Sequence, residues 1–346
     1  MKSKRIKLKK RIIKPTFKKP NKRIVLKHKR KIKYIAICFL IILIYFVSYF
    51  KVIKHKYNNI NNISYENLNI KEFINDTTNL DNQACQFIKY KLEKRTKPFD
   101  YENELIFITS LISCKIPFSF IRFGDGEVVI MTGKPISSPD RWHFDPKNKK
   151  FQESLIEASS ICINKNNFIA LPCKNWINFS KTILSFSKCN SSKYMSYTYL
   201  FVNKNFQAFK NWFLNFIKNS NRWKIILIAN SDVRKNISWA YKFYPIPNHI
   251  VEKWENLSLT LLPKLSAEAQ KNELIFFVSA GPAANVIISY LTKINNKNIY
   301  IDLGSSLEIF TKGYSTRFYT NNQNNGVANA GCEAFYLKDK EIYYED

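Results

Sequence analysis

Several signatures of common enzyme classes are missing from this chain of 346 residues. It has no Gly-x-Ser-x-Gly segment, which argues against an α/β-hydrolase nucleophile, and no Gly-x-x-x-x-Gly-Lys-Ser/Thr segment, which excludes a Walker A phosphate loop. The complete Gly-x-Gly-x-x-Gly dinucleotide fingerprint is also absent. The four histidines are not spaced as metal ligands, so we expect His143 and His249 to be structural or surface residues.

Acidic side chains are absent from residues 1–33, which hold 17 of the 55 lysines and arginines. The rest of the chain has 38 basic and 26 acidic residues, so it carries a net charge of +12 out of the total of +29. The basic excess is therefore concentrated in a short tail, and nucleic acid is not the expected partner of the chain as a whole. The moderately basic remainder suits anionic substrates such as nucleotide diphosphates.

Charged residues are also absent from residues 34–50, and the apolar stretch extends to residue 53 if Lys51 reaches back to the membrane surface. This length predicts a transmembrane helix over residues 34–53. A cleaved signal peptide is the competing interpretation, which the long basic segment and the lack of a small-residue cleavage site oppose. The basic flank places residues 1–33 in the cytoplasm. We therefore expect an uncleaved signal-anchor and a single-pass type II protein with a lumenal or extracytoplasmic C-terminal domain, Golgi-like if the cell is eukaryotic.

Cysteine spacing is compatible with an oxidising compartment but does not require one. The chain has no Cys-x-x-Cys pair, and Cys38 falls in the predicted anchor. The other six cysteines are an even number, which allows disulfides without fixing their pairing. Six N-glycosylation sequons follow the anchor, at Asn62, Asn75, Asn178, Asn190, Asn236 and Asn256. Some sequons arise by chance in so asparagine-rich a chain, so they are compatible with a secretory lumen without proving it.

Two further regions follow the predicted anchor. Residues 54–80 are polar and rich in asparagine, which is typical of a flexible stem. Residues 81–346 alternate short apolar runs with amphipathic stretches, which predicts one α/β domain: a Rossmann-like, mostly parallel sheet with helices on both faces. The expected strands are residues 118–123, 168–171, 195–202, 224–229, 274–279 and 298–302. The expected helices are residues 83–95, 101–114, 151–164, 203–218 and 233–242, with further helices beginning near residue 127 and ending at residue 291.

The first polar strand end has two carboxylates, Asp125 and Glu127, in a Gly-Asp-Gly-Glu turn. Ligands of open parallel sheets bind at the carboxyl ends of strands. Two close carboxylates repel each other unless a cation shares them, and Mg²⁺ or Mn²⁺ prefers such oxygen ligands. Gly124 and Gly126 give the backbone freedom at this turn, and Arg122 could contact a phosphate or orient a carboxylate. The alternative is an ordinary surface turn, since Asp-Gly is a common turn dipeptide.

The second polar strand end is Ser279-Ala-Gly-Pro-Ala-Ala-Asn285, where a strand passes through small residues into a helix. Backbone N–H groups at such a helix start can bind phosphate. The structural alternative is close packing of the strand against the helix.

Two more aspartates stand at strand ends. Asp302 precedes Leu303-Gly304-Ser305, so its carboxylate could bind a sugar hydroxyl or cap the following segment. Asp232 follows the apolar strand at residues 224–229.

Three blocks together resemble the GT-D-type glycosyltransferases, namely Arg122-Phe-Gly-Asp-Gly-Glu127, Val278-Ser-Ala-Gly-Pro-Ala-Ala-Asn-Val286 and Ile301-Asp-Leu-Gly-Ser305. The resemblance covers roughly residues 100–320. It implies a Rossmann-like domain, a nucleotide-sugar donor and a divalent metal near an Asp-x-Glu motif, which falls on Asp125 and Glu127. Some members have a histidine where Ser305 stands, and this departure indicates a different donor contact.

The resemblance does not explain the tail, anchor and stem, but together with the predicted anchor it implies a membrane-anchored hexosyltransferase that uses a nucleoside-diphosphate sugar, Mn²⁺ or Mg²⁺, and a glycan or glycoprotein acceptor. Asp125 and Glu127 would hold the metal, and Asp232 and Asp302 are candidates for the general base, with Glu127 as a third if it does not bind metal. The expected donor-binding residues are Arg122, Gly124, Gly126, Ser279, Gly281, Pro282, Ala283, Asn285, Gly304 and Ser305.

Two other functions fit parts of the sequence. A Rossmann-type methyltransferase would use the Gly-Asp-Gly turn to hold the amino-acid end of S-adenosylmethionine and would need no metal. A membrane-tethered binding protein without enzymatic activity would recognise RNA or anionic lipid through residues 1–33. Removing that tail would abolish its function, whereas the transferase would depend on Asp125.

Overall fold

A computed structural model of the chain describes residues 70–73, 80–138, 142–219, 222–315, 317, 331–338 and 341–344. The predicted basic tail 1–33 and the predicted anchor 34–53 lie outside these residues, as does most of the predicted stem 54–80. In the ranges that are described, no helix has both the length and the apolar character needed to cross a membrane.

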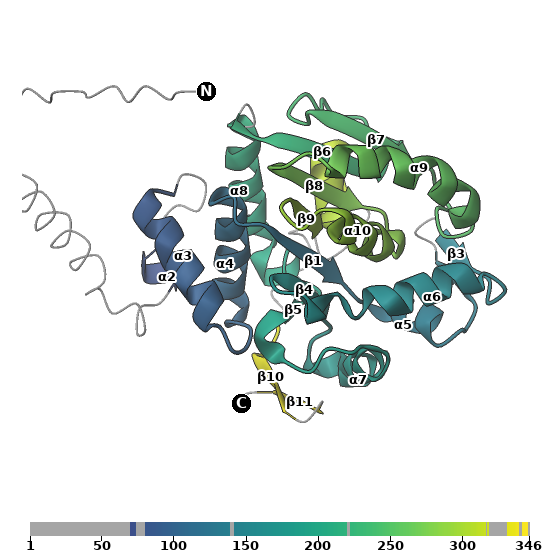
Figure 1. The fold of residues 1–346 in the computed structure, drawn as a ribbon, viewed down its shortest axis with the longest axis horizontal. Coiled ribbons are helices and arrows are strands. Elements are labelled where there is room, and N and C mark those ends of the chain that lie inside the picture. Colours follow the sequence, from purple (N-terminus) through teal and green to yellow (C-terminus); the bar gives the residue numbers. More distant parts are fainter. Residues whose placement is uncertain are drawn as a thin grey trace, which may run out of the picture. The chain divides into compact units, whose positions relative to one another are not determined.

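Within the described residues, seven parallel strands form one sheet in the order β5-β4-β1-β9-β8-β6-β7 (Figure 1). The last strand of the sheet in sequence, β9, lies between β1 and β8. The expectation of a mostly parallel sheet is confirmed. The sheet strands are β1 (Phe118–Arg122), β4 (Asn167–Leu171), β5 (Met195–Tyr197), β6 (Lys224–Asn230), β7 (Lys242–Ile246), β8 (Leu274–Ser279) and β9 (Ile299–Asp302). Two antiparallel hairpins lie outside the sheet, β2 (Ile136–Ser138) with β3 (Trp142–Phe144), and β10 (Phe335–Lys338) with β11 (Glu341–Tyr344).

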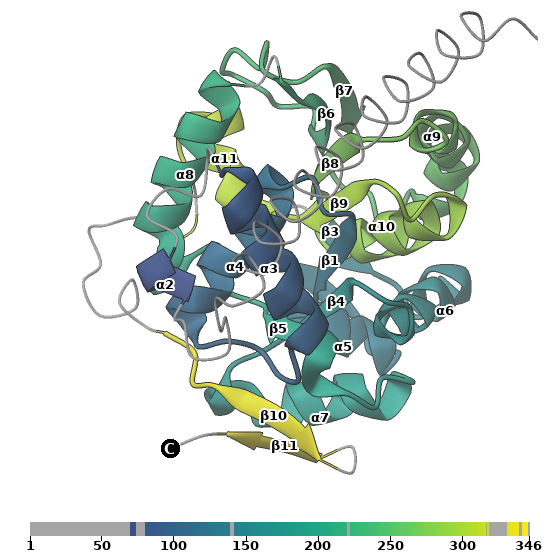
Figure 2. The same ribbon diagram turned by 60° about the vertical axis from the view of Figure 1, so that its left-hand side comes forward.

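Helices cover both faces of the sheet, as Figures 1 and 2 show from two directions. On one face Phe107 packs on Phe168 of β4, and Phe213 packs on both Phe277 of β8 and Phe310. The helices on that face are α3 (Asn82–Lys94), α4 (Tyr101–Ser113), α8 (Phe206–Lys218) and α11 (Glu308–Thr311). The opposite face carries α5 (Asp125–Met131), α6 (Lys149–Ala158), α7 (Ile177–Phe186), α9 (Trp254–Ala269) and α10 (Ala283–Ile294). Short 3₁₀ turns include η1 (Ile161–Ile163), η2 (Lys174–Trp176), η3 (Ser192–Tyr194), η4 (Asn203–Asn205) and η6 (Gly304–Leu307).

The expected helix 233–242 is wrong, because residues 233–241 are an irregular loop and β7 begins at Lys242. The side chain of Asn236 accepts a hydrogen bond from the N–H of Ser238, which gives the backbone an alternative to a helix. The N–H groups of Arg234 and Lys235 both donate to the carbonyl of Thr311, so the loop is held by tertiary contacts. The expected strand 195–202 is also shorter than predicted, since β5 ends at Tyr197.

Part of the segment expected to be a stem is helical. Residues Ile70–Phe73 form α2, and Ile70 is buried against the domain. The N–H of Lys71 donates to Oδ1 of Asn103 over 3.1 Å, and its Nζ lies 2.8 Å from Glu102. Chain packing against the domain therefore begins before residue 81.

Six cysteines in the described part form three disulfide pairs. Cys85 pairs with Cys114, linking α3 to α4, and Cys162 pairs with Cys189. Cys173, just after β4, pairs with Cys332 near the C-terminal hairpin. The Cα–Cα distances of 5.4, 5.9 and 5.1 Å lie in the range usual for disulfides.

An ion pair between Arg95 and Glu104 is fully buried beneath the sheet. Arg95 donates from Nη1 and Nη2 to the two carboxylate oxygens over 2.7 and 2.9 Å, and neither side chain is exposed. Ser196 Oγ and the N–H of Phe99 also donate to this carboxylate, and the carbonyl of Met195 accepts from Arg95. The network ties the start of α4 to β5.

We expect Glu104→Gln to lower the free energy of unfolding by about 3–5 kcal/mol, because it leaves the Arg95 charge buried without its partner. Glu102→Gln is the matched control, since Glu102 pairs with Lys71 and Lys204 at the surface and such pairs contribute about 1 kcal/mol or less. Urea unfolding of the detergent-solubilised chain measures both. Equal midpoint shifts for the two variants would contradict the expected difference.

Candidate functional site

The central strands β1 and β9 separate at their carboxyl ends. Their pairing stops at Phe120 and Ile301, whereas the pairing of β1 with β4 continues to Arg122 and Ala170. After β1 the chain enters α5 on one face of the sheet, and after β9 it enters η6 and α11 on the other. Such a reversal is the place where open α/β sheets bind ligands. The split between β1 and β9 therefore defines the candidate site.

Asn285 of α10 replaces the missing strand partner at the split. Its Nδ2 donates to the carbonyl of Arg122 over 2.8 Å, and its Oδ1 accepts from the N–H of Arg122 over 3.3 Å. The side chain is fully buried. Buried backbone groups need such partners, so Asn285 holds the end of β1 in place. The predicted donor-binding role of Asn285 stays a prediction, and these contacts show that its side chain also positions β1.

Arg122 and Asp302 form an ion pair across the split. Arg122 Nε lies 3.2 Å from Oδ2, and Nη2 lies 3.3 Å from Oδ1. The carbonyl of Thr198 accepts from Nη1 over 3.2 Å, and the N–H of Gly304 donates to Oδ1 over 2.9 Å. In this structure Arg122 contacts a carboxylate and Asp302 accepts from the N–H of Gly304, while the predicted phosphate and sugar contacts stay predictions.

Gly304 is required by this arrangement. Its φ is +50°, in the left-handed region that favours glycine, and a Cβ there would lie 1.7 Å from Nη2 of Arg122. The neighbouring Ser305 lies half-buried in η6.

Asp125 and Glu127 lie in the first turn of α5, which begins two residues earlier than expected. Asp125 is exposed. Glu127 turns back along the helix, and its Oε2 accepts from the N–H of Gly124 over 2.9 Å. A Cβ at Gly124 would lie 3.2 Å from that oxygen, while Gly126 is buried. Carboxylates in a first turn are favoured by the positive end of the helix.

Burial, helped by the negative charges of Asp302 and Asp125, raises the pKa of Glu127 to about 7 against the opposing hydrogen bond from the N–H of Gly124. Burial also raises the pKa of Asp302, although the Arg122 charge opposes this. Carboxyl groups are thus crowded at the split, and Arg122 compensates Asp302 directly. A divalent cation beside Asp125 and Glu127 would relieve the remaining repulsion, so the residues fit one.

The start of α10 lies at the carboxyl end of β8, the strand next to β9. Gly281 is exposed with a φ of +54°, whereas Pro282 and Ala283 are buried. No described side chain caps this helix start. Ser279, at the end of β8, is half-buried. The helix start can therefore offer backbone donors to an anion.

Asp232 is separated from the other candidates. It follows β6, which stands two strands from β9, so roughly 10 Å of sheet lies between the two strands. Its carboxylate pairs with Arg234, with Nε 3.2 Å from Oδ1. The structure thus brings Arg122, Glu127 and Asp302 together and leaves Asp232 at the margin.

Thr198 is a site residue that we did not predict. Its Oγ1 donates to the carbonyl of Phe123 over 2.6 Å and lies 3.1 Å from the carbonyl of Ala170, while its own carbonyl accepts from Arg122. It follows β5 directly at the same edge of the sheet. It fell inside the predicted strand 195–202, so no strand end marked it in the sequence.

A family model described as a GT-D fold-like domain matches residues 105–310. A selenomethionine-substituted structure of domain of unknown function 1792 is 17% identical, with a TM-score of 0.44, and the match covers 69% of this chain and 93% of that one. Another structure, reported to show that this highly conserved domain has a distinct glycosyltransferase fold, is 16% identical, with a TM-score of 0.42 and coverages of 68% and 93%. A search of curated proteins found no match.

The raised pKa of Glu127 has a measurable effect on stability. A carboxyl group whose pKa is higher in the folded state favours folding below its unfolded pKa, and that contribution is lost as the pH rises through the folded value near 7. We therefore expect Glu127→Gln to gain stability over the metal-free wild type by about 2 kcal/mol more at pH 8 than at pH 5. Chemical unfolding in the presence of a chelator measures this, and a pH-independent difference would contradict it.

Proposed function

Because the chain belongs to the family of GT-D fold-like domains, we propose that it is a glycosyltransferase that moves a hexose from a nucleoside-diphosphate sugar to an acceptor hydroxyl. The observation that carries the proposal is the pair of carboxylates at the start of α5, Asp125 and Glu127, beside the split between β1 and β9. Both residues lie inside the range that the family model matches. The acceptor would be a glycan or glycoprotein.

Asp125 and Glu127 would hold a divalent cation, Mn²⁺ or Mg²⁺. Bound there, the cation would neutralise the negative charge that develops on the departing diphosphate. Asp125 is exposed, so its carboxylate can bind a cation whose coordination is completed by phosphate oxygens of the donor.

The start of α10 would bind the donor's phosphates or nucleotide. Its backbone N–H groups carry the partial positive charge of a helix N-terminus, and Gly281 leaves the approach open. Asn285 and Gly304 would act indirectly, because they fix the end of β1 and the Arg122–Asp302 pair.

If Glu127 does not bind the cation, it is the best placed of the candidate bases. Both oxygens of Asp302 already bind Arg122, and Asp232 pairs with Arg234 away from the split. A base with a pKa near 7 is suited to accept a proton from an acceptor hydroxyl. In this assignment Asp125 and the donor's diphosphate hold the cation without Glu127.

The test is a screen of nucleotide sugars with the detergent-solubilised full chain, following donor hydrolysis and transfer with and without Mn²⁺. We expect activity with at least one nucleotide sugar, loss on chelation, and a decrease of at least 100-fold in Asp125→Asn. Glu157→Gln, at an exposed carboxylate paired with Lys293, is the control expected to keep full activity. Binding of S-adenosylmethionine instead of a nucleotide sugar, or activity that survives Asp125→Asn and chelation, would overturn the proposal.

The Glu127→Gln variant distinguishes the two proposed roles of Glu127, as general base or as metal ligand. If Glu127 is the base, the variant keeps Mn²⁺ and donor affinity but loses kcat by about 100-fold. If Glu127 is a ligand, the Mn²⁺ concentration required for half-maximal activity rises.

We also propose that residues 54–346 lie in an oxidising compartment, with residues 34–53 as the anchor and residues 1–33 in the cytoplasm. The three disulfide pairs support this, because disulfides are rare in reducing compartments. The sequon asparagines that the structure describes are all exposed, which is the position that glycosylation requires: Asn178, Asn190, Asn236 and Asn256.

Thiol counting tests this placement. The unfolded but unreduced chain, isolated from membranes, is expected to take up one maleimide-polyethylene glycol, at Cys38, and seven after reduction. The same chain kept in a reducing cytosol should take up seven in both states. Seven adducts on the membrane-derived chain without reduction would contradict an oxidising location.

A further inference from the structure

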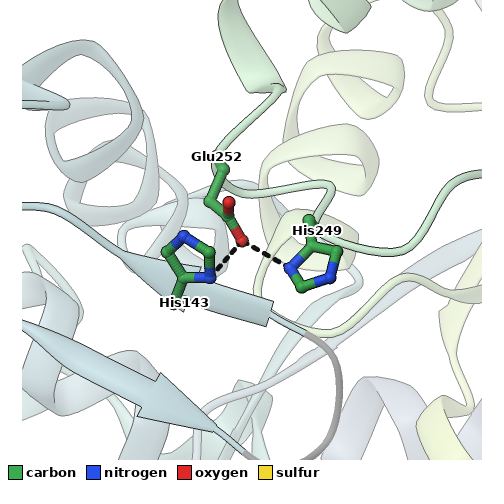
Figure 3. A group of neighbouring side chains, drawn as sticks. All are labelled: His143, His249 and Glu252. Atoms are coloured by element: carbon green, nitrogen blue, oxygen red, sulfur yellow. Dashed lines mark hydrogen bonds and ion pairs between the residues drawn. The ribbon is translucent and has the colours of Figure 1, made fainter.

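The side chains of His143, His249 and Glu252 meet in one cluster, as Figure 3 shows. Their ligand atoms lie within 4.8 Å of one another. Nδ1 of His249 lies 2.7 Å from Oε1 of Glu252, and Nδ1 of His143 contacts the same oxygen. The two imidazole rings are 5.4 Å apart between centroids.

The three residues come from distant parts of the chain. His143 is in β3, His249 is in the turn after β7, and Glu252 stands just before α9. Neighbouring contacts hold these segments together, since Nδ2 of Asn148 donates to the carbonyl of Val251 and the ring of Phe151 packs edge-on against Trp254. The cluster is thus placed by packed elements rather than by one flexible loop.

Two nitrogens and one carboxylate oxygen converge on the same point. A neutral imidazole has one N–H donor and one lone pair. In the tautomer with the proton on Nδ1 it donates to Oε1 of Glu252, and in the other tautomer its Nδ1 lone pair is available to a cation. Simple ion pairs contribute little at such exposure, with 46% of the His143 side chain and 45% of the His249 side chain exposed to solvent. His249 also adopts a φ of +63°, which is unfavourable for a non-glycine residue. A cation between the three groups satisfies all three lone pairs together.

We propose that His143, His249 and Glu252 bind a zinc ion, separate from the cation at Asp125 and Glu127. Imidazole nitrogens select Zn²⁺ over Mg²⁺ and Mn²⁺, which prefer oxygen ligands. Four-coordinate Zn²⁺ with two His and one carboxylate keeps a fourth position for water, which the solvent exposure of the cluster allows. Ligand atoms on such an ion are about 3.3 Å apart, so binding would move both imidazoles slightly away from Oε1 of Glu252, which Nδ1 of His249 contacts over 2.7 Å.

The bound ion would link the β2–β3 hairpin to the segment before α9. This hairpin follows α5, the helix that carries Asp125 and Glu127. The role is to hold the hairpin in place, and it does not depend on the transferase activity proposed above.

Co²⁺ and Zn²⁺ titrations of the full chain test the site. The chain is purified in detergent without a histidine tag, stripped with a chelator, and studied as Asp125→Asn so that the carboxylate site does not contribute. We expect one Co²⁺ per chain with the visible absorption of a four-coordinate ion, displaced by one equivalent of Zn²⁺. His143→Gln, His249→Gln and Glu252→Gln should each weaken Zn²⁺ binding at least tenfold.

Two controls match these substitutions. Glu255→Gln changes a nearby exposed carboxylate that pairs with Lys150, and His28→Gln with His55→Gln removes the histidines outside the cluster; both should keep Zn²⁺ affinity. Circular dichroism of each metal-free variant checks folding, which surface substitutions should preserve. No stoichiometric Zn²⁺ binding by the parent, or equal binding by the three cluster variants, would overturn the proposal, whatever the result of the nucleotide-sugar screen.

Discussion

The separation of β1 from β9 is the constraint on which the rest of the site depends. Where two parallel strands part at their ends, backbone N–H and C=O groups lose their hydrogen-bond partners. In this protein a side chain supplies those partners. Asn285 binds the backbone of Arg122, and the Arg122 side chain then spans the split to Asp302. Gly304 leaves room for that arginine. The opening is therefore held by polar contacts on both sides, and the start of α5 projects its carboxylates beside it.

The strands and their ends could be predicted because the core strands are continuous apolar runs that stop at polar residues. Lys224–Asn230 and Leu274–Ser279 are of this kind. The edge strand β7 was missed because Lys242–Ile246 mixes polar, aromatic and proline residues and is half-exposed. The loop at residues 233–241 was predicted as a helix because its local composition allows one. Its hydrogen bonds to Thr311 depend on tertiary structure, which composition does not encode.

The residues of the candidate site could also be predicted only in part. Sequence reasoning found Asp125, Glu127 and Asp302, because each follows a strand in a recognisable block. It could not choose between roles for Arg122, since the choice depends on Asp302, which is distant in sequence. It assigned His143 and His249 as structural or surface residues, because local spacing carries no information about a hairpin that folds against the turn after β7. Thr198 was missed because it fell inside the predicted strand 195–202, whereas β5 ends at Tyr197.

The place of β9 has a consequence for how the protein is made. This strand is the last of the sheet to be synthesised, yet it lies at the centre, between β1 and β8. Until it is inserted, both neighbours present open, apolar edges of the kind that pair with other chains. A growing or truncated chain would therefore hold two half-sheets that need protection by chaperones. Insertion of β9 completes the site and also covers the strand edges that could aggregate. Quality control during biosynthesis and formation of the site therefore depend on the same late folding step.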